Sequence, residues 1–348
     1  MSYSFRSFAP GRVNLIGEHT DYTGGLVFPM ALDLGITITG RVIPGELRAK
    51  SNNQSEPVHL RLPVEDLATV SPSWGRFLAA VLNRVPDSTG LDVEISSSLP
   101  SGGTGLSTST ALSCAFVLPL ATTPDRPDDI DRLQLAKLVK AAEQDATGVE
   151  TGIMDQLASL FGVAGSALMI DCHDLAITPV VVPDELQILI VHSGQERELV
   201  GSEYSDRREA CYAAQEQIGP LRLATLSDVA TLKDPTVRRI ATHVVGDNAR
   251  VRLMAAAFEA SDLDLAAQIL TEGHRSYADN FGASTATVEA MVAHLIAQPG
   301  IRAARLTGGG FGGSIVAFAE PGAQPNVDTW WTAAAPSAGA NISWISDA

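Results

Sequence analysis

The 348-residue sequence predicts an α+β fold in two lobes with a cleft between them. Its length exceeds what one ordinary hydrophobic core supports, so two packed units are expected. Segments with helix-like and strand-like apolar spacing occur in both halves. Pro179 and Pro183 separate two short apolar strands near the middle of the chain. We therefore place a domain boundary near residue 178, which gives lobes of residues 1–177 and 178–348.

Apolar clusters and alternation predict the strands, and length with three-to-four-residue spacing predicts the helices. In the first lobe we predict strands over residues 26–40, 91–97 and 167–171 and helices over residues 74–82, 107–118 and 128–146. In the second lobe we predict strands over residues 186–192 and 314–319 and helices over residues 203–217, 236–260, 263–273 and 286–297. The tail after Pro321 is predicted to hold a final helix and strand.

The composition is that of an acidic globular protein, with 45% hydrophobic residues, 18% charged residues and a net charge of −16. A nucleic-acid partner is excluded because phosphate binding along a strand needs a basic face. No apolar run reaches the roughly 18 residues of a membrane span, so we expect no membrane partner. The three cysteines are widely spaced, which predicts buried thiols and a cytoplasmic protein.

Residues 9–22 hold an unusual density of ionisable side chains directly after an apolar strand. Arg12, Glu18, His19 and Asp21 fall within ten residues. These groups would repel, pair or titrate if they had no ligand to hold, so the segment predicts a binding site for a polar molecule. The alternative is a solvated loop with incidental charges.

Residues 98–112 form a glycine- and hydroxyl-rich segment between a predicted strand and a predicted helix. Gly102, Gly103 and Gly105 allow backbone N–H groups to converge, and Ser107, Thr108 and Ser109 add hydroxyls at the helix N-terminus. These parts can hold a polyphosphate without lysine, and only four of the 24 basic residues are lysines. The alternative is a capped strand-to-helix turn. The segment is not a Walker A loop, because it lacks Gly-Lys-Ser/Thr.

A third segment, residues 306–314, contains five glycines in six residues. Such a run allows the backbone to approach a ligand or another chain segment closely. A flexible linker is the alternative. The run is flanked by a predicted apolar helix and an apolar strand, which favours a tight turn between the lobes.

In this order, the three segments resemble the signatures of galactokinases, members of the GHMP kinase superfamily. The resemblance implies the two-lobed GHMP architecture with the active site in the cleft between lobes. Two departures occur: residues 101–104 place four residues between Pro100 and Gly105 where the family usually has three, and Thr108 and Thr110 replace a serine and an alanine. We expect the insertion to alter ATP affinity before it removes activity. Residues 194–198 also depart from the family's usual Asn- and His-bearing stretch.

The resemblance implies a role for each matching residue. Residues 151–156 look like the segment that presents the catalytic aspartate, so Asp155 is the catalytic candidate and Arg12 its partner beside the phosphates. The implied sugar ligands are Glu18, His19, Asp21, Gly152 and Tyr204. The implied ATP contacts are Gly102, Gly103, Gly105, Leu106, Ser107, Thr108, Ser109 and, for adenine, Trp74. Ser109 and Glu143 are the implied Mg²⁺ ligands. Without the resemblance, Asp155 would be interpreted as a helix cap, Glu143 as a surface acid, and Tyr204 and Trp74 as packing residues.

The implied activity is ATP-dependent, Mg²⁺-assisted phosphorylation of α-D-galactose at O1. The alternatives are a related sugar 1-kinase, acting on N-acetylgalactosamine, L-arabinose or galacturonate, and a non-catalytic sensor that binds galactose and ATP. We expect small-molecule substrates as the only partners and a monomeric protein. Whether Asp155 removes the sugar proton or mainly positions the hydroxyl is left open by the residues.

Overall fold

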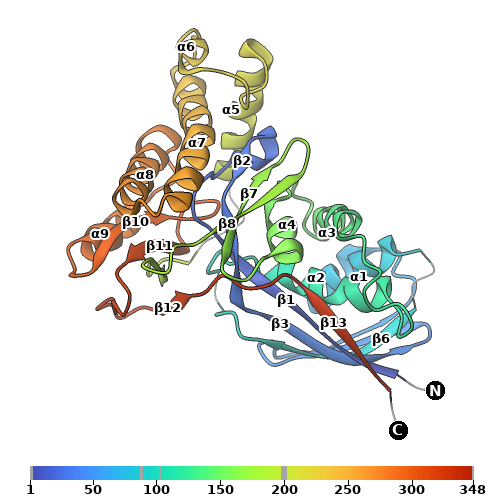
Figure 1. The fold of residues 1–348 in the computed structure, drawn as a ribbon. Helices are drawn as coiled ribbons and strands as arrows, with labels where there is room; N and C mark the ends of the chain where they lie inside the picture. Colours follow the sequence, from blue (N-terminus) through green and yellow to red (C-terminus); the bar gives the residue numbers. More distant parts are fainter. Residues whose placement is uncertain (1–2, 87–88, 102, 197–201, 347–348) are drawn as a thin grey trace.

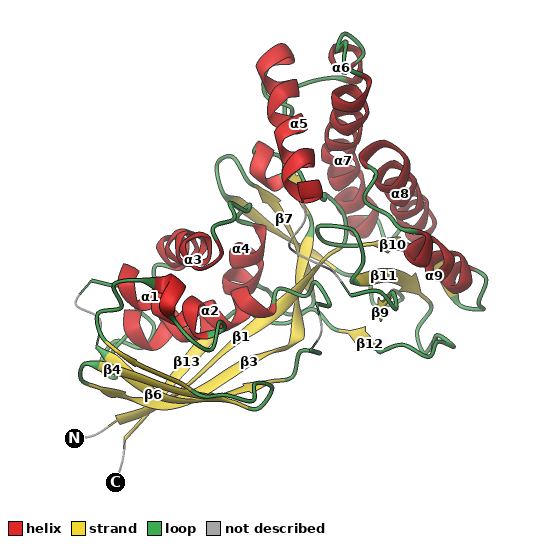
Figure 2. Ribbon diagram, turned by 180° about the vertical axis from the view of Figure 1, so that it is seen from behind, coloured by secondary structure: helices red, strands yellow, loops and turns green. Residues whose placement is uncertain are grey.

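A computed structural model describes residues 3–86, 89–101, 103–196 and 202–346. The predicted α+β architecture in two lobes is confirmed (Figure 1). One lobe is a large sheet with α1–α4 over one face, and helices α5–α9 gather at the other end of the molecule (Figure 2). Among the described residues, no helix is long and apolar enough to cross a membrane.

The first lobe is built on a six-stranded sheet in the order β13-β1-β3-β6-β4-β5. Its strands are β1 (Tyr3–Asn14), β3 (Pro29–Ile43), β4 (Glu46–Ser51), β5 (Val58–Arg61), β6 (Gly90–Ser97) and β13 (Asn341–Ser346). The helices above it are α1 (Gly75–Arg84), α2 (Thr108–Ala121), α3 (Arg132–Thr147) and α4 (Met154–Phe161). Helix α2 is apolar on nearly every side because it lies between the sheet and the other helices.

The second lobe has a four-stranded sheet in the order β10-β11-β9-β12. Its strands are β9 (Gln187–His192), β10 (Ile301–Leu306), β11 (Ser314–Ala319) and β12 (Trp331–Ala334). Its helices are α5 (Ser202–Ile218), α6 (Leu226–Val229), α7 (Pro235–Glu259), α8 (Leu263–Ser276) and α9 (Ala286–Ile296), and a π-helical turn, η3 (Tyr277–Phe281), follows α8. The long helix α7 begins where Asp234 caps its first N–H groups and Pro235 occupies the first turn.

A small sheet in the order β2-β7-β8 lies between the two lobes. It consists of β2 (Leu26–Val27), β7 (Ser166–Asp171) and β8 (Ala176–Val181). Helix α7 contacts all three of its strands. One hydrophobic core therefore runs from Phe5 in β1 through Phe258 in α7 to Phe318 in β11.

The two ends of the described chain lie in the same lobe. The last strand, β13, pairs antiparallel with β1, so both ends of the chain lie together in the first sheet (Figure 1). The predicted boundary near residue 178 falls inside β8, which pairs with β7. The division into residues 1–177 and 178–348 stays a prediction. Strand β13 belongs to the second of these segments but pairs with β1 in the sheet of the first lobe.

Most predicted elements are present, and the differences have physical causes. Residues 301–306 precede the third glycine segment as strand β10, where we expected a helix, because pairing with β11 outweighs the helix propensity of their Ala, Arg and Leu residues. The expected helix after Pro321 is absent from the described tail, which forms β12 and β13. Pro325, Pro336 and Gly339 interrupt any helix there. The edge strand β5 and its neighbour β4 were not predicted.

Candidate active site

The side chains of Arg12 and Asp155 form a two-pronged ion pair between β1 and the first turn of α4. Arg12 Nε donates to Asp155 Oδ1 and Arg12 Nη2 donates to Oδ2, both at 2.8 Å. Only 6% of the Arg12 side chain is exposed, whereas 28% of the Asp155 side chain is. A register shift in β1 between Pro10 and Arg12 marks a bulge, a feature that re-aims side chains beside active sites. The carboxylate of Asp155 is thus fixed from one side and open on another.

The glycine- and hydroxyl-rich segment of residues 98–112, called the phosphate loop below for its predicted role, lies directly against this pair. Arg12 Nη1 donates to the carbonyl of Gly105 at 2.7 Å, and the backbone N–H of Arg12 donates to the carbonyl of Leu106 at 3.2 Å. The hydroxyl of Ser107 donates to Asp155 Oδ2. The structure therefore brings together the residues predicted from two segments some 90 positions apart and from α4.

The loop has the left-handed backbone that its glycines permit. Gly103, Gly105 and Ser107 have φ values of 60°, 75° and 58°. Apart from its chain neighbours, no atom of the described residues lies within 4 Å of the position that a Cβ of Gly105 would occupy, so the loop faces open space there. Thr108 and Ser109 form the first turn of α2, where unpaired N–H groups attract anions. Gly102 lies outside the described residues.

The third glycine segment packs onto the phosphate loop. Ser314 Oγ donates to the carbonyl of Thr104 at 2.7 Å. A Cβ on Gly313 would lie 3.4 Å from the same carbonyl oxygen. Thr307 Oγ1 donates to the carbonyl of Asn14 at 2.6 Å, which joins the segment to the end of β1 as well. This contact supports a closing role for residues 306–314 over the loop.

Asp21 lies in contact with Gly152 and near enough to Asp155 for their charges to interact. A Cβ added to Gly152 would be 1.5 Å from Asp21 Oδ2, so only glycine leaves room for the carboxylate. Burial, and next the nearby negative charge of Asp155, raise the pKa of Asp21 to about 6. Two carboxylates and a glycine backbone therefore converge beside the phosphate loop.

The carboxylate of Glu18 is held by neighbouring protein groups. Arg305 Nη2 donates to Oε2, and Asn14 Nδ2 donates to Oε1 at 3.1 Å. Glu18 is 1% exposed and Arg305 is fully buried. The backbone N–H of Glu18 donates to Asp247 Oδ2 at 3.1 Å. The segment around Glu18 is thereby fixed to α7 and β10.

His19 has a left-handed backbone, with φ of 61°, and its ring nitrogens have two tyrosine partners. Nδ1 lies 3.0 Å from the hydroxyl of Tyr22, and Nε2 lies 3.0 Å from the hydroxyl of Tyr277. Tyr277 donates its own hydrogen to the carbonyl of Gly308 at 2.7 Å, so Nε2 of His19 carries the proton in this pair. The ring centroid of Tyr204 lies 5.2 Å from that of His19, which places the predicted Tyr204 beside the signature.

Glu143 is a buried carboxylate on α3 with one oxygen unused. Gln156 Nε2 donates to its Oε2 at 2.8 Å, and the Thr110 side chain also interacts with the carboxylate, while Oε1 makes no hydrogen bond of good geometry to a described residue. Burial raises the pKa of Glu143 to about 8. An unpaired buried carboxylate oxygen fits a ligand of a hard cation. No group of three or more His, Cys, Asp or Glu residues within the described ranges could hold a metal ion by itself.

Trp74 stands apart from the residues above. Its indole N–H donates to the carbonyl of Glu56 at 3.2 Å, and its ring packs on the core of the first lobe. It precedes α1, which contacts α2 and α3.

Sequence reasoning missed Arg305, Tyr277 and Asp247 as parts of the site. Their signal was weak because each has other polar residues nearby in the same segment, such as Arg302, Asn248 and Ser276, and this pattern also fits a surface position. The structure shows that all three are fully buried and contact residues 17–19 or Gly308.

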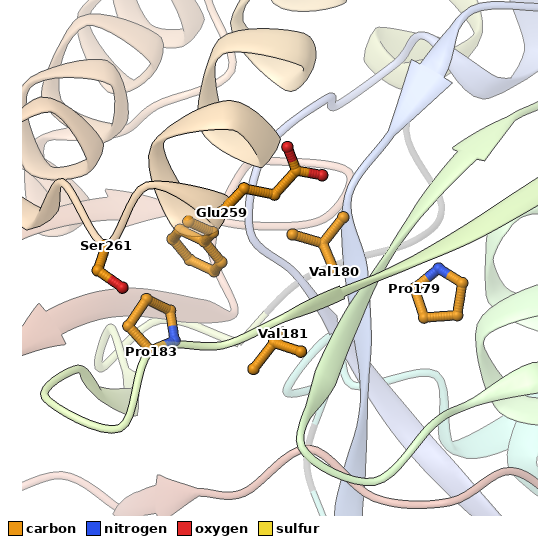
Figure 3. A pocket seen from close by; sticks show the side chains of 7 residues that line it. Pro179, Val180, Val181, Pro183, Glu259 and Ser261 are labelled. Atoms are coloured by element: carbon orange, nitrogen blue, oxygen red, sulfur yellow. The ribbon is translucent and has the colours of Figure 1, made fainter.

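A surface pocket of about 430 Å³ lies elsewhere, between β8 and the end of α7. Pro179, Val180, Val181 and Pro183 face Glu259 and Ser261 across it (Figure 3). None of the predicted site residues lines this pocket, so it is separate from the site around Asp155.

Three family descriptions match the chain. The galactokinase galactose-binding signature matches residues 2–42, the GHMP kinases N terminal domain matches residues 74–163, and the GHMP kinases C terminal domain matches residues 254–328. The first contains Arg12 and Asp21, the second the phosphate loop and Asp155, and the third the glycine segment. Fold and site together define a GHMP kinase.

Similarity to known proteins shows which family of GHMP kinases the chain belongs to. The chain is 36% identical to the galactokinase of Chloroflexus aggregans, over 90% of this chain and 83% of that protein. It is 36% identical to the galactokinase of Homo sapiens, over 91% and 84% of the two chains. The structure of Lactococcus lactis galactokinase complexed with galactose matches with a TM-score of 0.88 at 25% identity, covering 97% of this chain and 95% of that chain. The chain belongs to the galactokinase family, as its three sequence segments predict.

Proposed function

We propose that the chain transfers the γ-phosphoryl group of ATP to O1 of α-D-galactose, giving galactose 1-phosphate and ADP. The observation that carries this proposal is the Arg12–Asp155 pair beside the phosphate loop, with Nε–Oδ1 and Nη2–Oδ2 distances of 2.8 Å. Phosphoryl transfer relies on positioning and on stabilising charge at the transferring group. The buried Arg12 of β1 and the reachable carboxylate of Asp155 in α4 lie beside the N-terminus of α2 and supply those needs.

In this proposal Asp155 orients or deprotonates the sugar hydroxyl, and Arg12 stabilises charge on the transferring phosphoryl group. The backbone of Gly102, Gly103, Gly105 and Leu106 and the hydroxyls of Ser107, Thr108 and Ser109 would hold the phosphates, and we assign Trp74 to the adenine. Ser109 and Glu143 would hold Mg²⁺, which neutralises negative charge on the phosphates when bound. The unused Oε1 of Glu143 supports that assignment.

For the sugar, we assign Asp21 as an acceptor for hydroxyl groups, with Gly152 approaching by its backbone and Tyr204 and His19 forming an aromatic edge. Glu18 completes the set as a buried carboxyl group whose two oxygens accept from Arg305 and Asn14. The free cysteines Cys114, Cys172 and Cys211 support a reducing, cytoplasmic setting. We also propose a monomer, which light scattering after gel filtration tests.

The deciding experiment measures ADP release with Mg·ATP and a panel of galactose, 2-deoxygalactose, N-acetylgalactosamine, L-arabinose, galacturonate and glucose. Turnover highest on galactose supports the proposal. Turnover highest on another sugar would keep the kinase and replace the substrate. No turnover on any sugar, together with galactose binding by calorimetry, would overturn the proposal in favour of a sensor.

A further inference from the structure

The loop after β9 binds the third glycine segment by main-chain hydrogen bonds. The N–H of Ser193 donates to the carbonyl of Gly313 at 2.8 Å. The N–H of Gly313 donates to the carbonyl of Gln195 at 2.9 Å. A Cβ on Gly312 would lie 2.9 Å from the Gln195 carbonyl oxygen, so the two backbones are in direct contact. This loop is where the sequence departs from the family's usual stretch.

The side chain of Gln195 adds two further bonds. Its Nε2 donates to the carbonyl of Phe311 at 3.4 Å, and its Oε1 accepts from Thr285 Oγ1 at 2.7 Å. Thr285 is the N-cap of α9, so its position is fixed by that helix. Gln195 is thus a bridge between α9 and the glycine segment.

Phe311 needs such a bridge because its backbone is strained. Its φ of 63° is unfavourable for a residue with a Cβ. The N–H of Phe311 donates to the carbonyl of Ala283 at 2.7 Å, and its carbonyl accepts from Gln195. Both peptide groups flanking the strained residue are therefore held from outside the glycine segment.

The held segment in turn contacts the phosphate loop. Ser314 Oγ donates to the Thr104 carbonyl at 2.7 Å. The position of a Cβ on Gly313 is 3.4 Å from the Thr104 carbonyl oxygen and 3.6 Å from that of Gly103. Gln195 is therefore linked to the phosphate loop by two successive contacts. Gln195 contacts residues 311–313, and residues 313–314 contact residues 103–104.

We propose that Gln195 is a positioning residue that sets nucleotide affinity by fixing residues 311–314 against the phosphate loop. The inference rests on the proposed placement of the ATP phosphates at residues 102–109. Gln195 acts through its neighbours and touches neither substrate nor reacting atoms in this assignment. Its effect is specific to the nucleotide, since none of its bonds reaches Asp21, Gly152 or His19.

The test compares Gln195→Ala with Gln187→Ala. Gln187 is the first residue of β9, the strand that leads into this loop, and it is also partly buried. Its side-chain amide donates to the Ala323 carbonyl at 2.9 Å and accepts from the Gly322 N–H at 2.6 Å, away from the glycine segment. Calorimetry measures the Kd of Mg·ADP and of galactose for each protein. Thermal melts give the melting temperature, and steady-state assays give KM and kcat separately. Losing two hydrogen bonds should raise the nucleotide Kd and the KM for ATP of Gln195→Ala about three- to tenfold.

Support requires that the galactose Kd of Gln195→Ala stays within twofold and that Gln187→Ala changes neither Kd. An unchanged nucleotide Kd, or equal weakening of both ligands, overturns the inference. If Gln195→Ala does not fold, Gln195→Glu replaces it: this variant keeps the acceptor for Thr285 and loses the donor to Phe311, and the same outcomes apply. Wild-type protein that binds Mg·ADP without phosphorylating galactose would refute the proposed function and leave this comparison intact.

Discussion

Two arginine–aspartate pairs of similar geometry differ in their surroundings. Arg84 binds Asp145 through Nε at 2.6 Å and Nη2 at 2.9 Å, and both side chains are 39% exposed. Arg12 and Asp155 form the same two-pronged contact, but Arg12 is buried and also bonds the phosphate loop. The burial of Arg12 and its hydrogen bond to Gly105 distinguish the pair in the candidate site from the pair on the surface.

We predict that Asp155→Asn lowers kcat about 10²- to 10⁴-fold while the fold persists, because the amide can still accept from Arg12 but loses the charge that orients the sugar hydroxyl. Steady-state ADP release with galactose and circular dichroism measure the two effects. The matched control is Asp145→Asn, which removes the same charge from an exposed pair and should leave kcat unchanged. Near-normal kcat in folded Asp155→Asn would remove Asp155 from the mechanism.

Gly152 provides a second prediction. Its Cβ position is 1.5 Å from Asp21 Oδ2, so Gly152→Ala must displace that carboxylate. We expect the galactose Kd to rise about tenfold or more, since displacements near 1 Å disturb bound geometry strongly, while the Mg·ADP Kd stays constant. Calorimetry measures both. Gly246→Ala is the control, because the nearest side-chain atoms to its added methyl are the guanidinium nitrogens of Arg250, at 3.1 Å, and not a predicted sugar ligand. Unchanged galactose binding would contradict a sugar site between Asp21 and Gly152.

The raised pKa of Asp21 predicts a pH-dependent stability. Its pKa is about 6 when folded and 3.8 in its ordinary state, so the folded protein binds the proton more tightly. Stability from this group is complete below about pH 3.8 and is lost as the pH rises through about 6. Asp21→Asn should therefore stabilise the protein at pH 7.5 by about 1–2 kcal/mol, reduced by the partial exposure of the residue.

Thermal melts of both proteins from pH 4 to pH 7.5 measure this effect. The gain of Asp21→Asn should shrink toward zero near pH 4, and galactose binding should weaken at pH 7.5. A gain that is constant with pH, or larger at pH 4, would show that Asp21 does not titrate as stated. The expected gain in stability with loss of binding is typical of a group kept for function.

At the scale of the element, the π-helical turn η3 joins the sugar signature to the third glycine segment. Such turns often occur at functional sites. Its first residue, Tyr277, is fully buried, and its hydroxyl bonds both Gly308 and His19. We predict that Tyr277→Phe destabilises the protein by about 1–3 kcal/mol, because it leaves the buried Gly308 carbonyl without this donor. It should also weaken galactose binding by freeing the His19 ring.

Thermal melts and galactose calorimetry check the Tyr277→Phe prediction. Ser314→Ala is a useful comparison, because it removes a hydroxyl bond from the same glycine segment at its phosphate-loop end. Ser314→Ala should affect Mg·ADP more than galactose, and Tyr277→Phe should show the opposite preference. Identical effects of the two variants on both ligands would argue against separate roles for the two ends of the segment.

Elements with strong local patterns were predictable from sequence. Strand β11 (Ser314–Ala319) is a continuous apolar run and was predicted with those bounds, and α7 and α9 were placed within one residue at each end. Strand β8 was missed because four of its six residues are polar-facing or exposed and it contains Pro179. Strand β10 was mistaken for a helix because its Ala, Arg and Leu residues favour a helix locally, and pairing with β11 overrides that preference.

At the scale of the whole molecule, one core crosses the predicted boundary, and β13 closes the edge of β1. Phe5 of β1 packs on Trp344 of β13 with ring centroids 5.5 Å apart. Because the lobes share buried side chains from β1 to β11, we predict a single calorimetric unfolding transition for the intact chain. A fragment of residues 1–177 should fail to fold, since it lacks β13 and the part of the core that α7 supplies.

Differential scanning calorimetry of the intact chain and circular dichroism of the fragment test this prediction. Two well-separated transitions, or a folded and cooperative fragment, would establish residues 1–177 as an independent domain. Trp344→Ala tests the closing strand directly and should lower the melting temperature without changing the KM for galactose.

Local residue types and their spacing were enough to predict the family, the order of its three segments and most of the candidate residues. Tertiary structure alone decided that Glu18 pairs with Arg305, that Gln195 holds the glycine segment, and that β13 returns to β1. Each of these contacts joins residues far apart in the chain. Long-range contacts depend on packing and burial of the whole fold, which local pattern does not encode.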